Sequence, residues 1–232
     1  YLSKENKIEA VHQTSWGMTT RTIGALIMVH GDDSGLVLPP RVAPVQINIV
    51  PIQQNKEGVL DKAYSLKEEL VKAGFRVKVD DSDKTPGFKF ADGEVRGIPL
   101  RLEIGPKDIE KEQAVLVRRD TREKAVVSLS ALTGEVKRIL ETVQNEMYAR
   151  ALAFQKERTT DAKTLDELVA SLDKKPGFVR AMWCGCRECE DKLKEYSGIT
   201  SRCIPDQQET ISDTCVVCGK KATKMVYWGR AY

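Results

Sequence analysis

Residues 14–40 read TSWGMTTRTIGALIMVHGDDSGLVLPP, a stretch with a polar opening, an apolar middle and a turn-rich end. The apolar run at 23–29 is bounded by turn residues, which is typical of a buried strand or a short buried helix. A 43-residue segment cannot bury such a run alone, so we expect it to need partner elements from elsewhere. Arg21 lies just before the apolar run and is close in sequence to Trp16, Gly17, Thr19 and Thr20. This group suits a flat anionic ligand, because arginine offers a planar fork to phosphate and stacks on adenine.

The composition is typical of a soluble globular protein. The chain has 232 residues, enough for one large or two small domains, and its 37 basic residues nearly balance 34 acidic ones. RNA binding would therefore have to come from local sites and not from bulk charge. No apolar run approaches the ~20 residues of a membrane helix, and no secretion signal is visible, so we expect a cytoplasmic protein. The chain begins at Tyr1 within a pattern, and we expect an upstream part.

Strand and helix patterns alternate after Pro44. Apolar and polar residues alternate at 45–49, 75–79 and 100–104, helical spacing covers 59–73 and 88–96, and shorter strand patterns stand at 115–117 and 125–127. This order predicts an α/β layer with a largely parallel sheet. A long helix is predicted from Thr133 to about Arg158, with an apolar stripe that ends at Phe154 and serves core packing. A capping box at 164–167 predicts the start of another helix.

All six cysteines lie between Cys184 and Cys218, and this clustering favours a metal site in a reducing compartment. A structural zinc ion takes four ligands. Cys215 and Cys218 form one pair with the usual spacing. For the second pair, Cys189 has two candidate partners, Cys184 and Cys186, and spacing alone favours Cys186.

The residues SWGMTTRTIGA at 15–25, HGDD at 30–33 and LPPRVAP at 38–44 resemble the third class II motif and the catalytic-domain exit of prolyl-tRNA synthetases of the archaeal/eukaryotic type. The resemblance continues to the last residue. It implies an α/β chain with the end of a class II catalytic domain at 1–43 and a mixed-sheet anticodon-binding domain at 44–132. A connecting helix and a small α+β zinc-binding domain follow at 133–232.

The same resemblance assigns roles to individual residues, although none is assigned with certainty as catalytic. It implies that ATP or the adenylate binds Thr19 and Arg21, and that the proline pocket is lined by Ser15, Trp16 and Gly17. It favours four residues as contacts of the anticodon: Glu94, Arg101, Asp108 and Lys124. It implies that the zinc ligands are Cys184, Cys189, Cys215 and Cys218. Cys203 is then expected to be a buried apolar residue. A solvated sheet edge is the plainer interpretation of the anticodon group.

The implied activity is ATP-dependent activation of proline, with Mg²⁺, and transfer of the prolyl group to the 3′ end of tRNA(Pro). A homodimer is implied for the complete enzyme. The first two class II motifs are missing from this chain, so we expect it to be inactive by itself. The alternatives are a non-catalytic tRNA-binding or scaffold protein and a zinc-ribbon nucleic-acid module. The resemblance implies that the terminal carboxylate of Tyr232 folds back toward the catalytic domain, with a frayed terminus as the alternative. His12 and His30 show no acid–base pattern.

Overall fold

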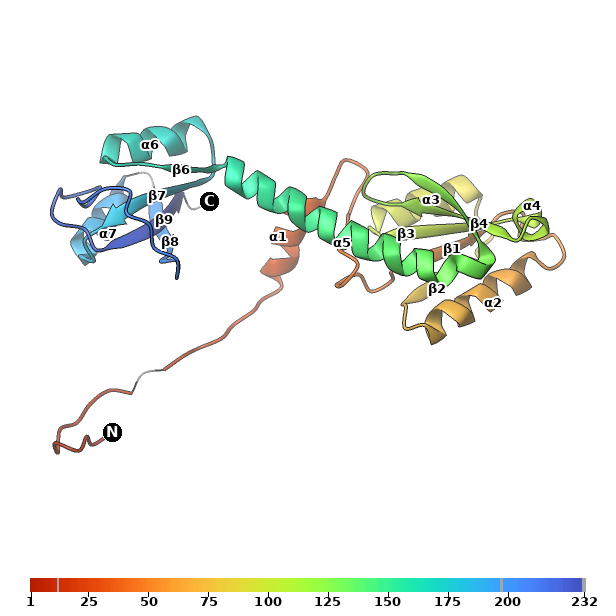
Figure 1. Ribbon diagram of the computed structural model, residues 1–232, viewed down its shortest axis with the longest axis horizontal. Coiled ribbons are helices and arrows are strands. Elements are labelled where there is room, and N and C mark those ends of the chain that lie inside the picture. Colours follow the sequence, from red (N-terminus) through yellow and green to blue (C-terminus); the bar gives the residue numbers. More distant parts are fainter. Residues whose placement is uncertain (12, 197, 231–232) are drawn as a thin grey trace. The chain divides into compact units, whose positions relative to one another are not determined.

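The computed structural model describes residues 1–11, 13–196 and 198–230, so the expectations for His12 and Tyr232 fall outside the described residues. The chain forms two compact units, residues 1–147 and 148–232, which are described separately below (Figure 1). The division falls within one continuous helix, α5 (Leu132–Glu157). Among the described residues, no helix is both long and apolar enough to cross a membrane.

The first unit is built on a five-stranded mixed sheet with the order β2-β1-β3-β4-β5. Strands β2, β1 and β3 are parallel, whereas β4 runs antiparallel to both β3 and β5. The predicted largely parallel sheet is therefore wrong for the β4–β5 side. Parallel neighbours need a crossover of a dozen or more residues, and the connections at 105–112 and 119–123 are shorter than that. The strands are β1 (Ile47–Pro51), β2 (Val77–Val79), β3 (Leu100–Ile104), β4 (Gln113–Arg118) and β5 (Lys124–Ser128).

The helices of this unit lie where the sequence places helical patterns, with two short additions. Figure 1 shows α2 and α3 on opposite sides of the sheet. A short helix, α4, and a 3₁₀ turn, η1, fill connections that the sequence analysis leaves as loops. The bounds are α1 (Arg21–His30), α2 (Val59–Lys72), α3 (Pro86–Val95), α4 (Pro106–Glu110) and η1 (Leu129–Ala131).

One face of the sheet forms the core of the unit. Alternate strand residues, such as Ile47, Leu102 and Leu116, are buried against α2 and the first half of α5. Within α5 the buried positions run from Leu132 to Met147. Farther along, Phe154 is 55% exposed, so the predicted core stripe ends earlier than the sequence pattern does.

The opposite face of the sheet is only partly covered. Helix α3 lies over β1, where a methyl group at Gly93 would be 3.5 Å from the Nδ2 atom of Asn48. Over β5 the sheet is open to solvent, since Lys124 is exposed and Val126 is 63% exposed. Of the polar residues predicted to read bases, Lys124 lies in this open part, whereas Arg101 lies on the same face but against α3.

The second unit is a four-stranded mixed sheet with two helices. The strand order is β6-β7-β9-β8, with β6 parallel to β7 and the other pairs antiparallel. Its small core includes Trp228, whose ring meets that of Trp183 edge to face at 6.4 Å. The predicted capping box is confirmed, because Thr164 accepts from the Glu167 amide and the Glu167 carboxylate accepts from the Thr164 amide. The elements are β6 (Thr159–Asp161), α6 (Leu165–Lys174), β7 (Phe178–Trp183), α7 (Arg187–Glu195), β8 (Ile199–Cys203) and β9 (Lys224–Arg230).

Two apolar features with patterns that suggest burial are exposed in this chain. The apolar run at 23–29 is helical, in α1, but it is not buried within this chain, since Ile23, Met28 and Val29 are more than half exposed. This exposure agrees with the expectation that the segment needs partner elements to cover it. Cys203, predicted to be buried, is exposed at the end of β8.

Candidate nucleic-acid interface and metal centre

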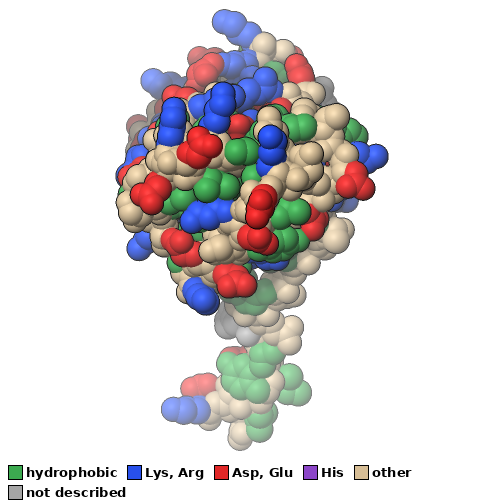
Figure 2. Space-filling model, turned by 90° about the vertical axis from the view of Figure 1, so that its right-hand side faces the viewer, with side chains coloured by type: hydrophobic (Ala, Val, Ile, Leu, Met, Phe, Trp, Pro, Cys, Tyr) green, Lys and Arg blue, Asp and Glu red, His purple; other side chains and the backbone are tan. Residues whose placement is uncertain are grey.

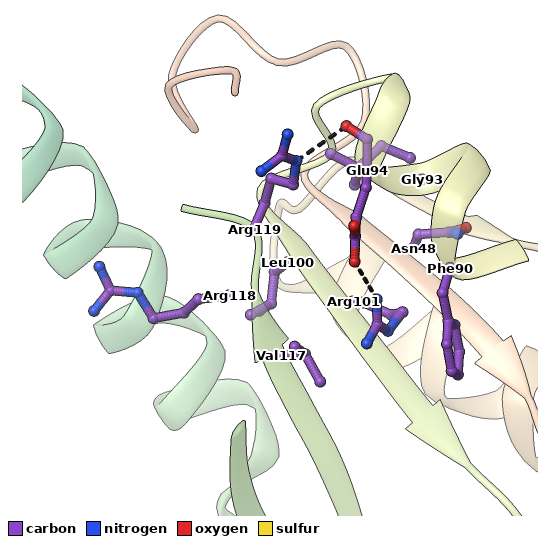
Figure 3. A pocket seen from close by; sticks show the side chains of 10 residues that line it. Asn48, Phe90, Gly93, Glu94, Leu100, Arg101, Val117, Arg118 and Arg119 are labelled. Carbon is purple, nitrogen blue, oxygen red and sulfur yellow. Dashed lines mark hydrogen bonds and ion pairs between the residues drawn. The ribbon is translucent and has the colours of Figure 1, made fainter. Parts of the chain in front are cut away.

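Helix α3 forms one side of the candidate nucleic-acid interface, and it places two of its side chains, Phe90 and Glu94, over the sheet. Thr85 caps the helix by accepting from the Phe88 amide at 3.4 Å, and Pro86 occupies the first turn, where its missing N–H costs nothing. Phe90 and Glu94 are four residues apart and therefore lie on one face of the helix. Both line a small cavity beside β3, together with Arg101 (Figure 3).

Arg101 is held in place from three sides. Its guanidinium carbon lies 3.9 Å from the centroid of the Phe90 ring, its Nε donates to Glu103 at 2.9 Å, and its Nη1 donates to Glu94 at 3.4 Å. The Arg101 and Glu103 side chains are about 15% exposed, while that of Glu94 is 31% exposed. Bonds between charged groups are stronger than neutral ones, so the guanidinium plane is fixed at the sheet surface.

A row of cross-strand neighbours extends this group across the sheet. Arg101 is opposite Val117, and Val117 is opposite Lys124. Side chains in one row point to the same face, and Lys124 stands two strands away from Arg101, a distance of about 10 Å. The structure therefore brings Glu94, Arg101 and Lys124 onto one face of the sheet.

Asp108, the fourth residue of the predicted group, is engaged differently. Its Oδ2 accepts from the Gly105 amide at 3.0 Å and its Oδ1 accepts from Gln113 at 3.3 Å. Asp108 thus caps the N-terminus of α4 with one carboxylate oxygen and joins the helix to β4 with the other. The sequence carries a signal for this role, because a proline at the first helical position with an aspartate two residues later is typical of a helix start.

Sequence reasoning missed Phe90 and Asn48. Asn48 is 3% exposed and lines the same cavity, and no described residue donates a hydrogen bond to its Oδ1. The cavity has a volume of about 20 Å³, enough for one water molecule. An inward-facing asparagine on a buried strand is the only signal in the sequence, and it gives no indication of the partner.

Charge on the visible surface is mixed. In the face drawn in Figure 2, Lys and Arg side chains alternate with Asp, Glu and hydrophobic ones. This view agrees with the nearly balanced charges of the sequence. Recognition of a polyanion at the open sheet would then depend on a few placed side chains.

The candidate metal centre lies in the second unit and is formed by four cysteines. The sulfur atoms of Cys184, Cys189, Cys215 and Cys218 all lie within 4.8 Å of one another. Two of the separations are 3.7 Å, from Cys184 to Cys189, and 3.8 Å, from Cys184 to Cys218. A tetrahedron with zinc–sulfur bonds of about 2.3 Å has edges of about 3.8 Å, so the four sulfurs fit a zinc ion.

Two short segments bring these thiols together. Cys184 follows β7 and Cys189 lies in the first turn of α7, with Gly185 at a φ of +87° allowing the reversal between them. Cys215 and Cys218 lie on a tight turn closed by a hydrogen bond from the Gly219 amide to the Cys215 carbonyl. The Val216 amide donates to Met182 at 2.9 Å and thereby fixes this turn to β7.

Cys186 lies outside the cluster, although its spacing matches that of a ligand. It occupies the position just before α7 without a capping hydrogen bond from its side chain, its sulfur contacts the Glu188 carboxylate, and its carbonyl accepts from the Trp183 ring at 3.1 Å. The geometry therefore places Cys184 and not Cys186 with the other three sulfurs. Spacing alone leads to the opposite choice.

The thiols of the cluster differ in acidity. Burial raises the pKa of Cys189 and of Cys184. Burial also opposes ionisation of Cys215, but the amides of Cys218, Val217 and Cys184 donate toward its sulfur, and its pKa falls to about 7. Cys215 is therefore the thiol prepared to become a thiolate, the form that binds metals.

The residues predicted to bind ATP and proline lie at the start of α1. Thr19 accepts from the Arg21 amide at 3.4 Å, and Arg21 is the first residue of the helix. Both are exposed, and Trp16 is 92% exposed. The stretch that includes Ser15 and Gly17 is thus laid out along the surface of this chain, and the structure does not gather it into a pocket.

Comparisons with known proteins cover both units. Residues 46–139 match the family described as "Anticodon binding domain", and residues 165–232 match "Prolyl-tRNA synthetase, C-terminal". Relatives named proline–tRNA ligase align along the full 232 residues in Lachnoclostridium phytofermentans, at 63% identity, and in Clostridium botulinum strain Loch Maree, at 57%. A third, from Agathobacter rectalis, is 60% identical over 233 residues.

The chain spans about half the length of these curated relatives, 48% of each. Their names do not specify a type, so the archaeal/eukaryotic type stays a prediction. The two matched domains follow one another in the order that the sequence analysis expects, and the similarity to the relatives leaves no part of the chain uncovered. On this basis the chain contains an anticodon-binding domain followed by a prolyl-tRNA synthetase C-terminal domain.

Proposed function

We propose that this chain is the C-terminal part of a proline–tRNA ligase, which activates proline with ATP and transfers it to tRNA(Pro). The observation that carries the proposal is the 63% identity to a proline–tRNA ligase over all 232 residues. The complete protein should catalyse proline-dependent exchange of pyrophosphate into ATP and should charge tRNA(Pro). A protein that binds tRNA(Pro) without either activity would instead be the non-catalytic binder.

For ATP and proline, the proposed contacts are Thr19 and Arg21 on the nucleotide and Ser15, Trp16 and Gly17 beside proline. Arginine suits this role because its planar donors match phosphate oxygens and because fixed cations, with Mg²⁺, stabilise charge on the transferring phosphates. The 232-residue chain by itself should show no pyrophosphate exchange, since the first two class II motifs are missing from it. Exchange by the isolated chain would contradict this.

For the anticodon, the proposed reader is the open face of the first sheet. Anticodons for proline end in two guanines. An arginine can donate to the O6/N7 edge of guanine and a carboxylate can accept from its N1/N2 edge, which are the groups that Arg101 and Glu94 offer. Lys124 would contact a neighbouring nucleotide, and Asp108 would act chiefly by shaping the α4 turn.

The test of the anticodon site is Arg101→Ala in the complete protein. Charging of tRNA(Pro) should fall, because the variant loses a guanine contact, whereas pyrophosphate exchange should be retained. Equal loss of both activities would indicate damage to the fold, and full charging would remove Arg101 from the site. Lys78→Ala, on the exposed β2 edge of the same sheet, is a matched control for removing a strand cation.

For the metal, the proposed occupant of the four-cysteine cluster is a structural zinc ion. Four thiolates complete its tetrahedron and leave no position for a substrate, so the ion would stabilise the small second unit and take no part in the chemistry. A homodimeric complete enzyme, a cytoplasmic location and the domain bounds 1–43, 44–132 and 133–232 also belong to this proposal.

A further inference from the structure

Arg119 is a buried arginine that the anticodon proposal does not use. It follows β4, and its side chain is 2% exposed. Its three donor nitrogens reach three oxygens: Nη1 and Nη2 donate to Asp32 at 2.8 and 2.6 Å, and Nε donates to the Glu94 carbonyl at 3.0 Å. A bidentate arginine–carboxylate pair of this kind defines position as well as charge.

The Asp32 side of this pair lies in the turn that follows α1, and that turn is fixed tightly against the end of α3. The Leu36 amide donates to the Val95 carbonyl at 3.1 Å, and the Leu38 amide donates to Gly97 at 3.2 Å. A Cβ atom on Gly35 would lie 2.6 Å from the Val95 Cα, so only glycine permits this approach. Gly35 also has a φ of +128°, which side chains rarely adopt.

Glu94 is the residue on which these contacts converge. Its carbonyl accepts from Arg119, its carboxylate accepts from Arg101, and the next residue, Val95, is paired with Leu36. Figure 3 shows the two arginines at opposite ends of Glu94, one at the backbone and one at the carboxylate. The direction of the carboxylate therefore depends on a backbone position that Arg119 and the 32–38 segment fix.

We propose that Arg119, held by Asp32, is a positioning residue that aims the Glu94 carboxylate at a guanine of the anticodon. This inference rests on the proposed function of the open sheet face. Arg119 itself is too deeply buried to touch RNA. It acts on the base through Glu94, and Asp32 supplies the charge that allows the guanidinium to stay buried.

The test measures guanine reading separately from stability. In the complete protein, kcat/KM for charging is compared between tRNA(Pro) and the same tRNA with inosine in place of each anticodon guanine in turn. Inosine lacks the 2-amino group, so a charged hydrogen bond at that position gives the parent protein a penalty of about tenfold or more. Asp32→Asn and Arg119→Lys should reduce this penalty to about twofold, with pyrophosphate exchange unchanged.

Arg122→Lys is the matched control, because Arg122 contacts Ser34 in the same turn but does not reach Glu94. It should keep the full inosine penalty. Thermal unfolding of each variant is recorded alongside, and Asp32→Asn, which preserves shape, carries the test if Arg119→Lys does not fold. The inference is overturned if the Asp32→Asn protein retains the parent's inosine penalty, or if it loses charging of both tRNAs equally.

The Glu94→Gln variant shows whether a negative result rejects only the positioning role of Arg119 or also the proposed anticodon function of this face. If Glu94→Gln also leaves the inosine penalty intact, Glu94 does not read guanine and the anticodon assignment of this face fails. If Glu94→Gln abolishes the penalty while Asp32→Asn does not, the anticodon assignment stands and only the positioning role of Arg119 is rejected.

Discussion

The guanidinium carbon of Arg101, on strand β3, lies 3.9 Å from the centroid of the Phe90 ring, on helix α3. This contact orients a cation that also bonds to two carboxylates. It makes Phe90 part of the proposed base-reading face, even though an aromatic residue at this position has a simpler interpretation as packing.

Replacing Phe90 by leucine should weaken tRNA recognition without unfolding the unit. Loss of a cation–π contact worth roughly 0.5–2 kcal/mol should lower kcat/KM for charging by roughly two- to thirtyfold. The control is Phe88→Leu, since Phe88 is 55% exposed on the same helix and does not contact Arg101. Equal effects of the two substitutions on charging would argue against a specific role for the Phe90–Arg101 contact.

Metal analysis should distinguish the two candidate cysteines. Purified Cys186→Ser protein should contain about one zinc ion per chain, as a four-thiolate site requires. Cys184→Ser should contain much less and should melt at a lower temperature, because binding energy of a structural metal is folding energy. The reverse pattern would mean that the Cys184 sulfur is near the cluster without being a ligand.

Zinc binding should release protons. The raised pKa values of Cys184 and Cys189 keep these thiols protonated at neutral pH, and a thiol must lose its proton to bind metal. Adding zinc to the chelated protein near pH 7 should therefore acidify a weakly buffered solution by two or more protons per site, read with a pH indicator. Zinc affinity should also fall from pH 8 to pH 6, and an affinity independent of pH would contradict a thiolate site.

The Asp32–Arg119 pair predicts a specific loss of stability in acid. The hydrogen bond from Arg119 lowers the pKa of Asp32 from 3.8 to about 2. A carboxylate with a lowered folded-state pKa contributes stability above pH 3.8, and this contribution is lost as pH falls toward 2. The unfolding free energy of the parent should thus fall more between pH 5 and pH 2 than that of Asp32→Asn, measured by urea titration. Asp33→Asn should behave like the parent, and if it instead matches Asp32→Asn, the pair is not responsible.

The capping box of α6 offers a test confined to the second unit. Thr164→Ala removes the hydroxyl that accepts from the Glu167 amide at 3.2 Å. It should destabilise that unit by about 1 kcal/mol, with Thr164→Ser restoring most of the loss. The zinc content should not change, since the cap lies on a different helix from Cys189.

The sequence predicts well what depends on local pattern. Alternation identifies β1 and β3, helical spacing identifies α2 and α5, and clustered cysteines indicate a candidate metal site, because each signal lies within a short window. The choice of Cys184 over Cys186 depends instead on resemblance, since spacing alone favours Cys186, whose sulfur lies outside the four-cysteine cluster. The direction of β4 also lies outside the local pattern, since the antiparallel direction follows only from the short connections on either side of the strand.

Contacts between distant residues could not be predicted in this way. Asp32 and Arg119 are 87 residues apart, and nothing in either local sequence indicates that they meet. The length of the first segment does indicate that the apolar run at 23–29 cannot be buried by that segment alone, but the sequence does not indicate which elements would cover it. Asp108 is a third example. Its carboxylate could serve either RNA recognition or helix capping, and only the hydrogen bonds in the structure show that it caps α4.

Helix α5 belongs to both compact units, with side chains buried in the first unit as far as Met147. Backbone amides in its first half should exchange with deuterium only when that unit opens globally. Beyond Met147, where Tyr148 and Phe154 are exposed, local fraying is enough for exchange. A single uninterrupted helix should therefore show a step in protection partway along its length, which would mark the boundary between two units that no loop separates.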